Sequence, residues 1–144
     1  MSTPVSPVAR AKLAAFDLSG RVILITGGSG LLGVEHAKAI ADAGGTPVIA
    51  DLRVDAARDC AASIAAEYGV PASAVELDVT SSASAQAALA AVLAQHGRLD
   101  GLVNNAAHNP KVEGKGLAAS RFENFSLEAS RMALPRSRMG CVER

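Results

Sequence analysis

The chain is poor in aromatic residues and in cysteine. Phe, Tyr and Trp make up only 3% of its 144 residues, with no tryptophan and a single tyrosine. A globular core must therefore be built from small and aliphatic side chains, and a hydrophobic content of 49% supplies enough of them. Cys60 and Cys141 are far apart and match no metal-binding or redox spacing. This scarcity argues against a disulfide scaffold and fits a reduced, cytoplasmic setting.

An excess of charge of either sign is also absent. Lysine plus arginine and aspartate plus glutamate number 14 each, so no global field recruits nucleic acid or an anionic membrane. No apolar run approaches the roughly 18 residues of a membrane span. Pro4 and Pro7 stand where a signal peptide would need its apolar region. We expect a one-domain cytoplasmic protein with no nucleic-acid or membrane partner.

What the sequence does contain is a glycine-rich turn between a strand and a helix. Val22–Ile25 is a β-branched apolar run typical of a buried strand, and a helical pattern begins at Leu31. Between them lies Thr26-Gly27-Gly28-Ser29-Gly30, and Gly33 completes the spacing G-x-G-x-x-G. Such a turn directs backbone N–H groups and the positive end of the helix dipole at one point. This arrangement suits a phosphate or pyrophosphate.

Two other interpretations of the turn are a P-loop and a flexible turn without a ligand. A nucleoside-triphosphate P-loop is excluded, because Val34-Glu35 follows Gly33 in place of Lys-Ser/Thr. A flexible glycine turn with no ligand stays as the alternative. If the turn binds phosphate, replacing Gly30 with valine is expected to block phosphate approach and to demand a forbidden φ.

The rest of the pattern alternates strands with helices over short connections. Further strands are predicted at Thr46–Ala50, Ala74–Leu77 and Leu99–Val103. Helices are predicted over Leu31–Ala43, over Val54–Tyr68 before Gly69, and from an N-cap at Thr80 or Ser81 to Gly97. Right-handed crossovers then predict an α/β fold, a Rossmann-type doubly wound parallel sheet of order 3-2-1-4. The predicted buried stripes are Leu32, Ala39, Ile40 and Ala43; Val54, Ala57, Ala61, Ile64 and Tyr68; and Ala85, Leu89, Val92, Leu93 and His96.

Three candidate binding residues follow strands whose carboxyl ends meet at one edge of such a sheet: Gly28, Asp51 and Asn104. Asp51 lies 18 positions beyond Gly33, where a dinucleotide site expects an acid that bonds the ribose hydroxyls. An adenosyl-methionine methyltransferase also places an acid after its second strand. Structural roles remain open too, as helix caps for Asp51 and Asp78 and as a sheet-end hydrogen-bonder for Asn104.

Four motifs in order carry a family resemblance: Thr26–Gly33, Asp51, Asp78-Val79, and Asn104-Asn105-Ala106-Ala107 after the fourth strand. With them the chain resembles the short-chain dehydrogenase/reductase family, whose members are NAD(P)-dependent oxidoreductases. The resemblance implies a small carbonyl, alcohol or sugar substrate. It also implies a cofactor-binding set of Thr26, Gly27, Gly28, Ser29, Gly30, Leu31, Gly33, Asp51, Arg53, Asp78, Val79, Asn104 and Ala106.

The resemblance further implies a role for each part of that set. Gly27, Gly30 and Gly33 shape the pyrophosphate turn, and Gly28 and Ser29 offer backbone contacts. Asp78 and Val79 hold the adenine, and Asn104 and Ala106 line the edge of the cofactor. Asp51 would repel a 2′-phosphate and so favour NAD over NADP, a preference that Arg53 softens. Leu31 stands where the compact branch of the family usually has glycine. The spacing of Gly27, Gly30 and Gly33 looks more like the extended, sugar-nucleotide-modifying branch, whereas the Asn-Asn-Ala-Ala run resembles the compact branch, so both branches stay open.

The family's catalytic tyrosine and the lysine four residues after it are missing from this sequence. The single tyrosine, Tyr68, is followed four positions later by Ala72. His108, Lys111 and Lys115 have no partner tyrosine. We therefore expect no catalytic residue in this chain, which would carry the NAD-binding half and be inactive alone. A non-catalytic dinucleotide-binding module is the alternative.

The chain is expected to divide into an arm (1–20), an incomplete dinucleotide-binding domain (21–116) and an irregular tail (117–144). From about Ala129 the tail has no helical or strand period, as a truncated or frame-shifted product would; a natural divergent tail is the alternative. An unpaired fourth strand would make the chain marginally stable and prone to aggregate, without a defined oligomer.

Overall fold

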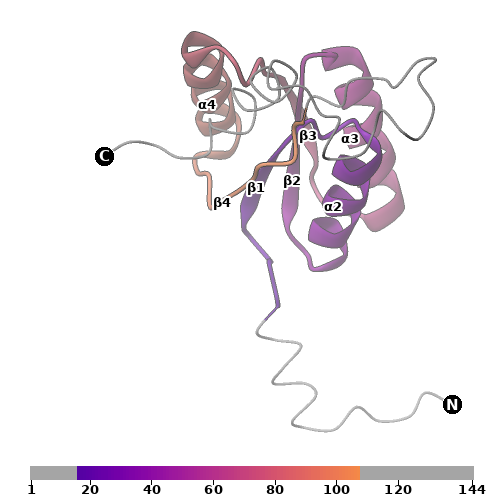
Figure 1. Cartoon of the computed structure of the whole chain (residues 1–144). Helices are drawn as coiled ribbons and strands as arrows, with labels where there is room; N and C mark the ends of the chain where they lie inside the picture. Colours follow the sequence, from indigo (N-terminus) through magenta and orange to yellow (C-terminus); the bar gives the residue numbers. More distant parts are fainter. Residues whose placement is uncertain (1–15, 108–144) are drawn as a thin grey trace, which may run out of the picture.

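The computed structural model of the chain describes residues 16–107 (Figure 1). The predicted arm before Phe16 and the tail after Ala107, with His108, Lys111 and Lys115, lie outside these residues. The strands are β1 (Val22–Thr26), β2 (Thr46–Asp51), β3 (Ser73–Glu76) and β4 (Gly101–Val103). The helices are α2 (Leu31–Asp42), α3 (Val54–Tyr68) and α4 (Ser82–His96). The elements follow the predicted order, with ends shifted by one or two residues.

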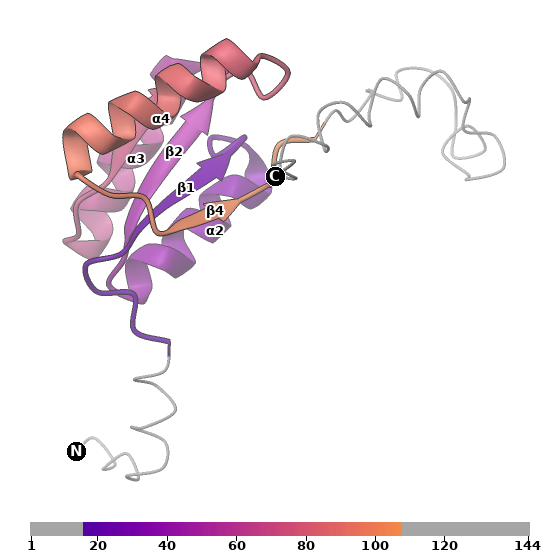
Figure 2. The same ribbon diagram turned by 90° about the vertical axis from the view of Figure 1, so that its left-hand side faces the viewer.

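The four strands form one parallel sheet of order β3-β2-β1-β4, which confirms the predicted topology. Helices α2 and α3 cover one face and α4 covers the other (Figures 1 and 2). Alternate residues of each strand supply the two cores. Ile25 and Ile49 pack with α2 and α3, whereas Leu24 and Val48 pack with α4. Both cores are aliphatic, as the scarcity of aromatics requires.

The rotation of two helices about their axes differs from prediction. Leu32 of α2 is 65% exposed, and Leu89 and Leu93 of α4 are 43% and 44% exposed. The buried residues are Gly33, Ala37, Ile40 and Ala41 in α2 and Ala88 and Val92 in α4, of which only Ile40 and Val92 belong to the predicted stripes. A helix approaches a sheet most closely through its small residues, so the most hydrophobic stripe need not be the buried one. In α3 the predicted Ala57, Ala61 and Ile64 are buried.

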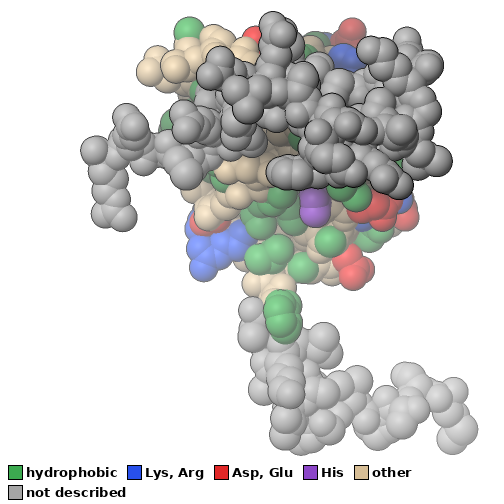
Figure 3. Space-filling model, viewed as in Figure 1, with side chains coloured by type: hydrophobic (Ala, Val, Ile, Leu, Met, Phe, Trp, Pro, Cys, Tyr) green, Lys and Arg blue, Asp and Glu red, His purple; other side chains and the backbone are tan. Residues whose placement is uncertain are grey.

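The helix ends follow the predicted signals. Gly69 and Gly97 adopt left-handed φ of 68° and 72° where α3 and α4 end. Ser81, and not Thr80, caps α4, because the Ser84 N–H donates to Ser81 Oγ at 3.2 Å. On the face seen in Figure 3, acidic and basic side chains both lie around hydrophobic ones, with no extended field of one sign on the visible described surface. No helix within residues 16–107 is long and apolar enough to cross a membrane.

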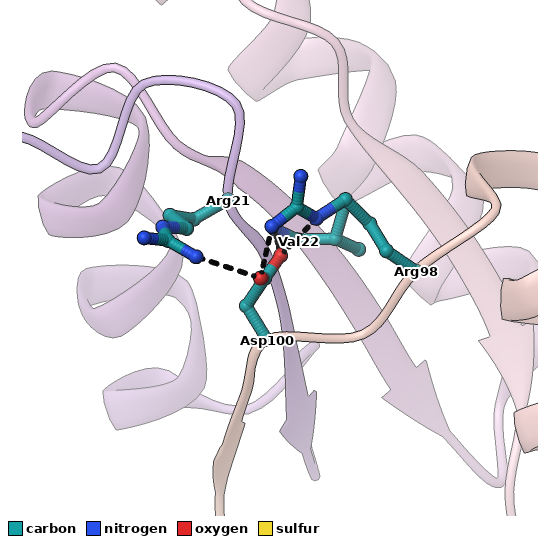
Figure 4. A network of polar contacts seen from close by, with 4 residues as sticks. All are labelled: Arg21, Val22, Arg98 and Asp100. Carbon is teal, nitrogen blue, oxygen red and sulfur yellow. Dashed lines mark hydrogen bonds and ion pairs between the residues drawn. The ribbon is translucent and has the colours of Figure 1, made fainter.

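Strand β4 is shorter than predicted, because Asp100 precedes it in a network of polar contacts with Arg21, Val22 and Arg98 (Figure 4). The Asp100 carboxylate accepts hydrogen bonds from the Val22 N–H at 2.8 Å, from Arg21 at 3.1 Å and from Arg98 at 2.6 and 2.8 Å. The Asp100 N–H donates to the Val22 carbonyl at 2.8 Å. These contacts fix the entry of β4 beside β1. The hydrogen bond from Arg98, then that from the Val22 N–H, holds the pKa of Asp100 far below its usual value.

Asp100 should make the fold sensitive to acid. Its carboxylate has a lower pKa in the folded than in the unfolded chain, so it stabilises the fold above the unfolded pKa of about 3.9. That contribution is lost as the pH falls below this value. We expect Asp100→Asn to lower the melting temperature at pH 7. Between about pH 5 and about pH 2, where the contribution of Asp100 is lost, the melting temperature of the variant should fall less steeply than that of the unmodified chain. Asp59→Asn, at an exposed position of α3, is the control. Parallel curves for Asp100→Asn and the unmodified chain would contradict this role.

Candidate functional site

A cleft of about 640 Å³ opens at the carboxyl edge of the sheet, where all four strands contribute the residues that follow them. Its walls combine apolar side chains with backbone and carboxylate groups. The lining residues are Gly27, Gly30, Leu31, Leu32, Asp51, Leu52, Arg53, Leu77, Asp78, Val79, Asn105, Ala106 and Ala107. The position is the one at which open α/β sheets bind ligands.

The glycine turn is built by tight backbone packing. A side-chain Cβ at Gly33 would lie 2.5 Å from the Gly27 carbonyl oxygen, so the start of α2 rests directly on the turn. Gly27 has a φ of +62°, and a Cβ there would lie 3.0 Å from the Ala106 Cα. Gly30, the N-cap of α2, has an ordinary φ of −80°, so the expected need for a forbidden φ at Gly30 was wrong. Gly27 is the residue of the turn whose positive φ favours glycine.

The Asp51 carboxylate ends β2 at the cleft, and its side chain is 11% exposed. Its oxygen Oδ2 accepts from Ser29 Oγ at 2.6 Å and from the Ser29 N–H at 3.2 Å. The other oxygen, Oδ1, accepts from the Arg53 N–H at 3.1 Å and lies 3.8 Å from Arg53 Nε. Burial by itself raises the pKa of Asp51, but the hydrogen bonds from Ser29 and Arg53 outweigh it and hold the pKa below its usual value. The group is therefore an ionised acceptor at neutral pH.

Asn105, which the sequence did not single out, joins β4 to the glycine turn. Its Nδ2 donates to the carbonyls of Thr26 and Gly27 at 3.0 and 3.1 Å, and its N–H donates to Thr26 Oγ1 at 3.0 Å. Asn104, the predicted residue, is exposed and does not line the cleft. Alternation along β4 could have revealed this. Leu102 is exposed and Val103 packs inward, so an extended backbone turns Asn105 inward as well.

Asp78 follows β3 and has a local structural partner. Its Oδ1 accepts from the Thr80 N–H at 2.9 Å and from Thr80 Oγ1 at 2.7 Å, while its own N–H donates to Ser84 Oγ at 2.9 Å. The sequence left open a helix-cap role for Asp78, but Ser81 caps α4, and the bonds of Asp78 hold the turn between β3 and α4 instead. The chain neighbours of Asp78, Leu77 and Val79, also line the cleft.

The structure thus gathers most of the predicted set. The predicted residues that line the cleft are Gly27, Gly30, Leu31, Asp51, Arg53, Asp78, Val79 and Ala106. Those that lie behind its wall are Thr26, Gly28, Ser29 and Gly33. Lining residues that were not predicted are Leu32, Leu52, Leu77, Asn105 and Ala107, mostly chain neighbours of predicted ones. Tyr68 packs against the core of α2 and α3 and does not line the cleft.

Such a site offers a defined chemistry. Apolar walls of Leu31, Leu52 and Val79 suit a flat ring system, and a buried ionised carboxylate suits a pair of hydroxyl donors. The turn at the start of α2 suits an anion. Within residues 16–107 no group of three or more His, Cys, Asp or Glu side chains could hold a metal ion.

Comparison with known proteins agrees with this geometry. Residues 21–128 match the family model described as short chain dehydrogenase. A galactitol 2-dehydrogenase of Agrobacterium fabrum is 40% identical over 106 residues, 74% of this chain and 40% of that protein. Three other curated relatives are matched over 33–36% of their length, so the chain spans about a third of them.

Solved structures show the same fold. The NADPH-dependent 3-quinuclidinone reductase of Rhodotorula rubra superposes with a TM-score of 0.70 at 29% identity, over 94% of this chain and 47% of that one. A xylitol dehydrogenase crystallised with NAD+ superposes with a TM-score of 0.60 at 32% identity, over 63% of this chain and 35% of that one. Both nucleotides thus occur among proteins similar to this chain.

Proposed function

Because the chain belongs to the short-chain dehydrogenase family, we propose that its cleft binds a nicotinamide dinucleotide, with NAD preferred over NADP. The observation that carries the proposal is the Asp51 carboxylate, nearly buried at the cleft and held on both oxygens. An ionised acid at the end of the second strand binds the vicinal hydroxyls of the adenosine ribose and disfavours a phosphate there.

The remaining residues supply the rest of the dinucleotide site. The Gly27–Gly30 turn and the start of α2 would hold the pyrophosphate, and only the Gly27 carbonyl lies near a Cβ placed at Gly30. The adenine would lie against Val79, with Asp78 accepting from its amino group. Ala106 would line the other end of the site, where Asn105 ties the turn to β4. The residues present therefore fit the cofactor.

We further propose that the family activity is hydride transfer between the dinucleotide and an alcohol or carbonyl substrate, with the nicotinamide ring as the carrier. This chain would contribute the nucleotide-binding part and would not turn over by itself. Its sequence has no tyrosine followed by a lysine four residues later, so the usual acid/base of this chemistry is missing from it. The same feature favours a second candidate function, a dinucleotide-binding module without catalysis.

Calorimetric titration of the purified chain with NAD and NADP tests the binding proposal. We expect NAD to bind more tightly, and Asp51→Ala to narrow the difference by on the order of 1–3 kcal/mol, since a negative carboxylate beside a negative phosphate is unfavourable. Asp55→Ala, at an exposed position of α3, is the control. Equal affinities for the two nucleotides in the unmodified chain would remove the argument from Asp51.

An activity assay tests the expectation that this chain does not turn over by itself. Names of relatives include galactitol and xylitol dehydrogenases, so a substrate panel should contain polyols beside simple alcohols and ketones. We expect no NAD reduction above a no-enzyme control from the chain alone. Turnover that disappears in Gly30→Val would show instead that this chain is a complete catalyst.

A further inference from the structure

We infer that Ser29 is a positioning residue that sets the nucleotide preference of the cleft, by holding the Asp51 carboxylate and the Arg53 guanidinium in fixed places. The inference rests on the proposed function, since it concerns the ribose end of the same site. The glycine motif assigns Ser29 no more than a backbone contact, whereas its side chain lies between the two charged groups of the site.

The direction of each hydrogen bond follows from the chemistry of the partners. A serine hydroxyl has one proton to donate, a carboxylate can only accept, and a guanidinium can only donate. Ser29 Oγ therefore donates to Asp51 Oδ2 at 2.6 Å and accepts from Arg53 Nη2 at 3.2 Å. The hydroxyl is an ordered bridge between an anion and a cation.

This bridge orients the carboxylate. Asp51 Oδ2 is held by the hydroxyl and the N–H of Ser29, and Oδ1 is held by the Arg53 N–H. A carboxylate has about four acceptor positions, so these three bonds fix its plane and leave acceptor capacity for a ribose hydroxyl. Without the 2.6 Å bond, Asp51 would lose its shortest restraint and would have to be ordered when the ribose binds.

The bridge also restrains the cation. The Arg53 side chain is 72% exposed, and its guanidinium is held by Ser29 Oγ and lies 3.8 Å from Asp51 Oδ1. Bound in this way, its charge is offset by Asp51 and is less available to a 2′-phosphate. Removal of the hydroxyl should therefore weaken the binding of NAD, which depends on an ordered Asp51. NADP gains nothing from that carboxylate and would meet a freer Arg53.

The test is Ser29→Ala, titrated with NAD and with NADP. We expect NAD affinity to fall about three- to tenfold, the typical net effect of one ordinary hydrogen bond, with NADP affinity unchanged or higher. The ratio of the two affinities is the deciding quantity, because a general loss of structure would weaken both nucleotides alike. Ser29→Thr keeps the hydroxyl and should retain the ratio of the unmodified chain. Ser63→Ala, at an exposed serine of α3, is the control.

The outcomes separate the inference from the proposed function. If Ser29→Ala lost affinity equally for both nucleotides, or lost no affinity for NAD, the role of Ser29 would be overturned. Binding of NAD to the unmodified chain would still uphold the proposed function in that case. If the unmodified chain bound neither nucleotide, the proposed function would fail and the inference with it. Melting curves of each variant establish that the comparison is between folded proteins.

Discussion

Replacing Gly33 with alanine should strongly lower the melting temperature of this chain, although alanine is the better helix former. The new Cβ would lie 2.5 Å from the Gly27 carbonyl oxygen, 2.7 Å from the Gly28 Cα and 2.8 Å from the Gly28 carbonyl carbon. These are backbone atoms, which cannot rotate out of the way. Overpacking of this kind typically costs about 1–3 kcal/mol and occasionally more, out of the roughly 5–15 kcal/mol that stabilise a whole domain.

Thermal and urea unfolding followed by circular dichroism would measure this loss. Gly30→Ala is the matched control, because it changes the same residue type three positions away. Gly30 has an ordinary φ of −80°, and a Cβ there would meet only the Gly27 carbonyl, at 3.2 Å. We expect that variant to keep its transition. A melting temperature of Gly33→Ala within a few degrees of the unmodified chain would mean that α2 can slide away from the turn.

Gly30→Val is expected to remove dinucleotide binding while leaving the fold intact. The extended backbone at Gly30 is open to a branched residue, but the side chain would stand in the wall of the cleft at the N-cap of α2. The N–H groups of Gly28, Ser29 and Gly30 donate within the protein, so a phosphate bound there would accept charge-assisted hydrogen bonds from the N–H groups that begin α2, each worth about 1.5–3 kcal/mol. Loss of two such bonds weakens binding by on the order of 100-fold or more.

Titration calorimetry with NAD measures that loss, and circular dichroism verifies the fold of the variant. Gly30→Ala is the intermediate step and should bind more tightly than Gly30→Val. Undiminished NAD binding by a folded Gly30→Val would show that the glycine serves only the geometry of the turn. Together the two substitutions test whether Gly33 is required by packing and Gly30 by the ligand.

Much of this architecture was accessible from the sequence because it depends on local interactions. The β-branched run before Thr26 predicts a buried strand, and Gly69 and Gly97 end their helices because glycine adopts left-handed φ without strain. Alternation of strands and helices, with the right-handed rule for crossovers, is enough to give the order 3-2-1-4. The same order brings the residues after each strand to one edge, so Asp51 and Asp78 could be assigned to one cleft.

Tertiary packing decided the details that determine the site. Leu89 and Leu93 are exposed because α4 approaches the sheet through Ala88 and Val92, a choice made by close packing and not by hydrophobicity. Asn105, and not Asn104, reaches the glycine turn because Val103 packs against the core of α2 and α3 and side chains alternate along the extended chain.

The arrangement of Ser29, Asp51 and Arg53 at the cleft was likewise decided in three dimensions. Ser29 and Asp51 are 22 residues apart, and only the packing of the glycine turn on β2 brings the hydroxyl within 2.6 Å of the carboxylate. The motif spacing predicts that an acid stands at this point. It does not predict which groups orient that acid, because those contacts join side chains from separate loops, whose distances depend on how the strands and the helices pack.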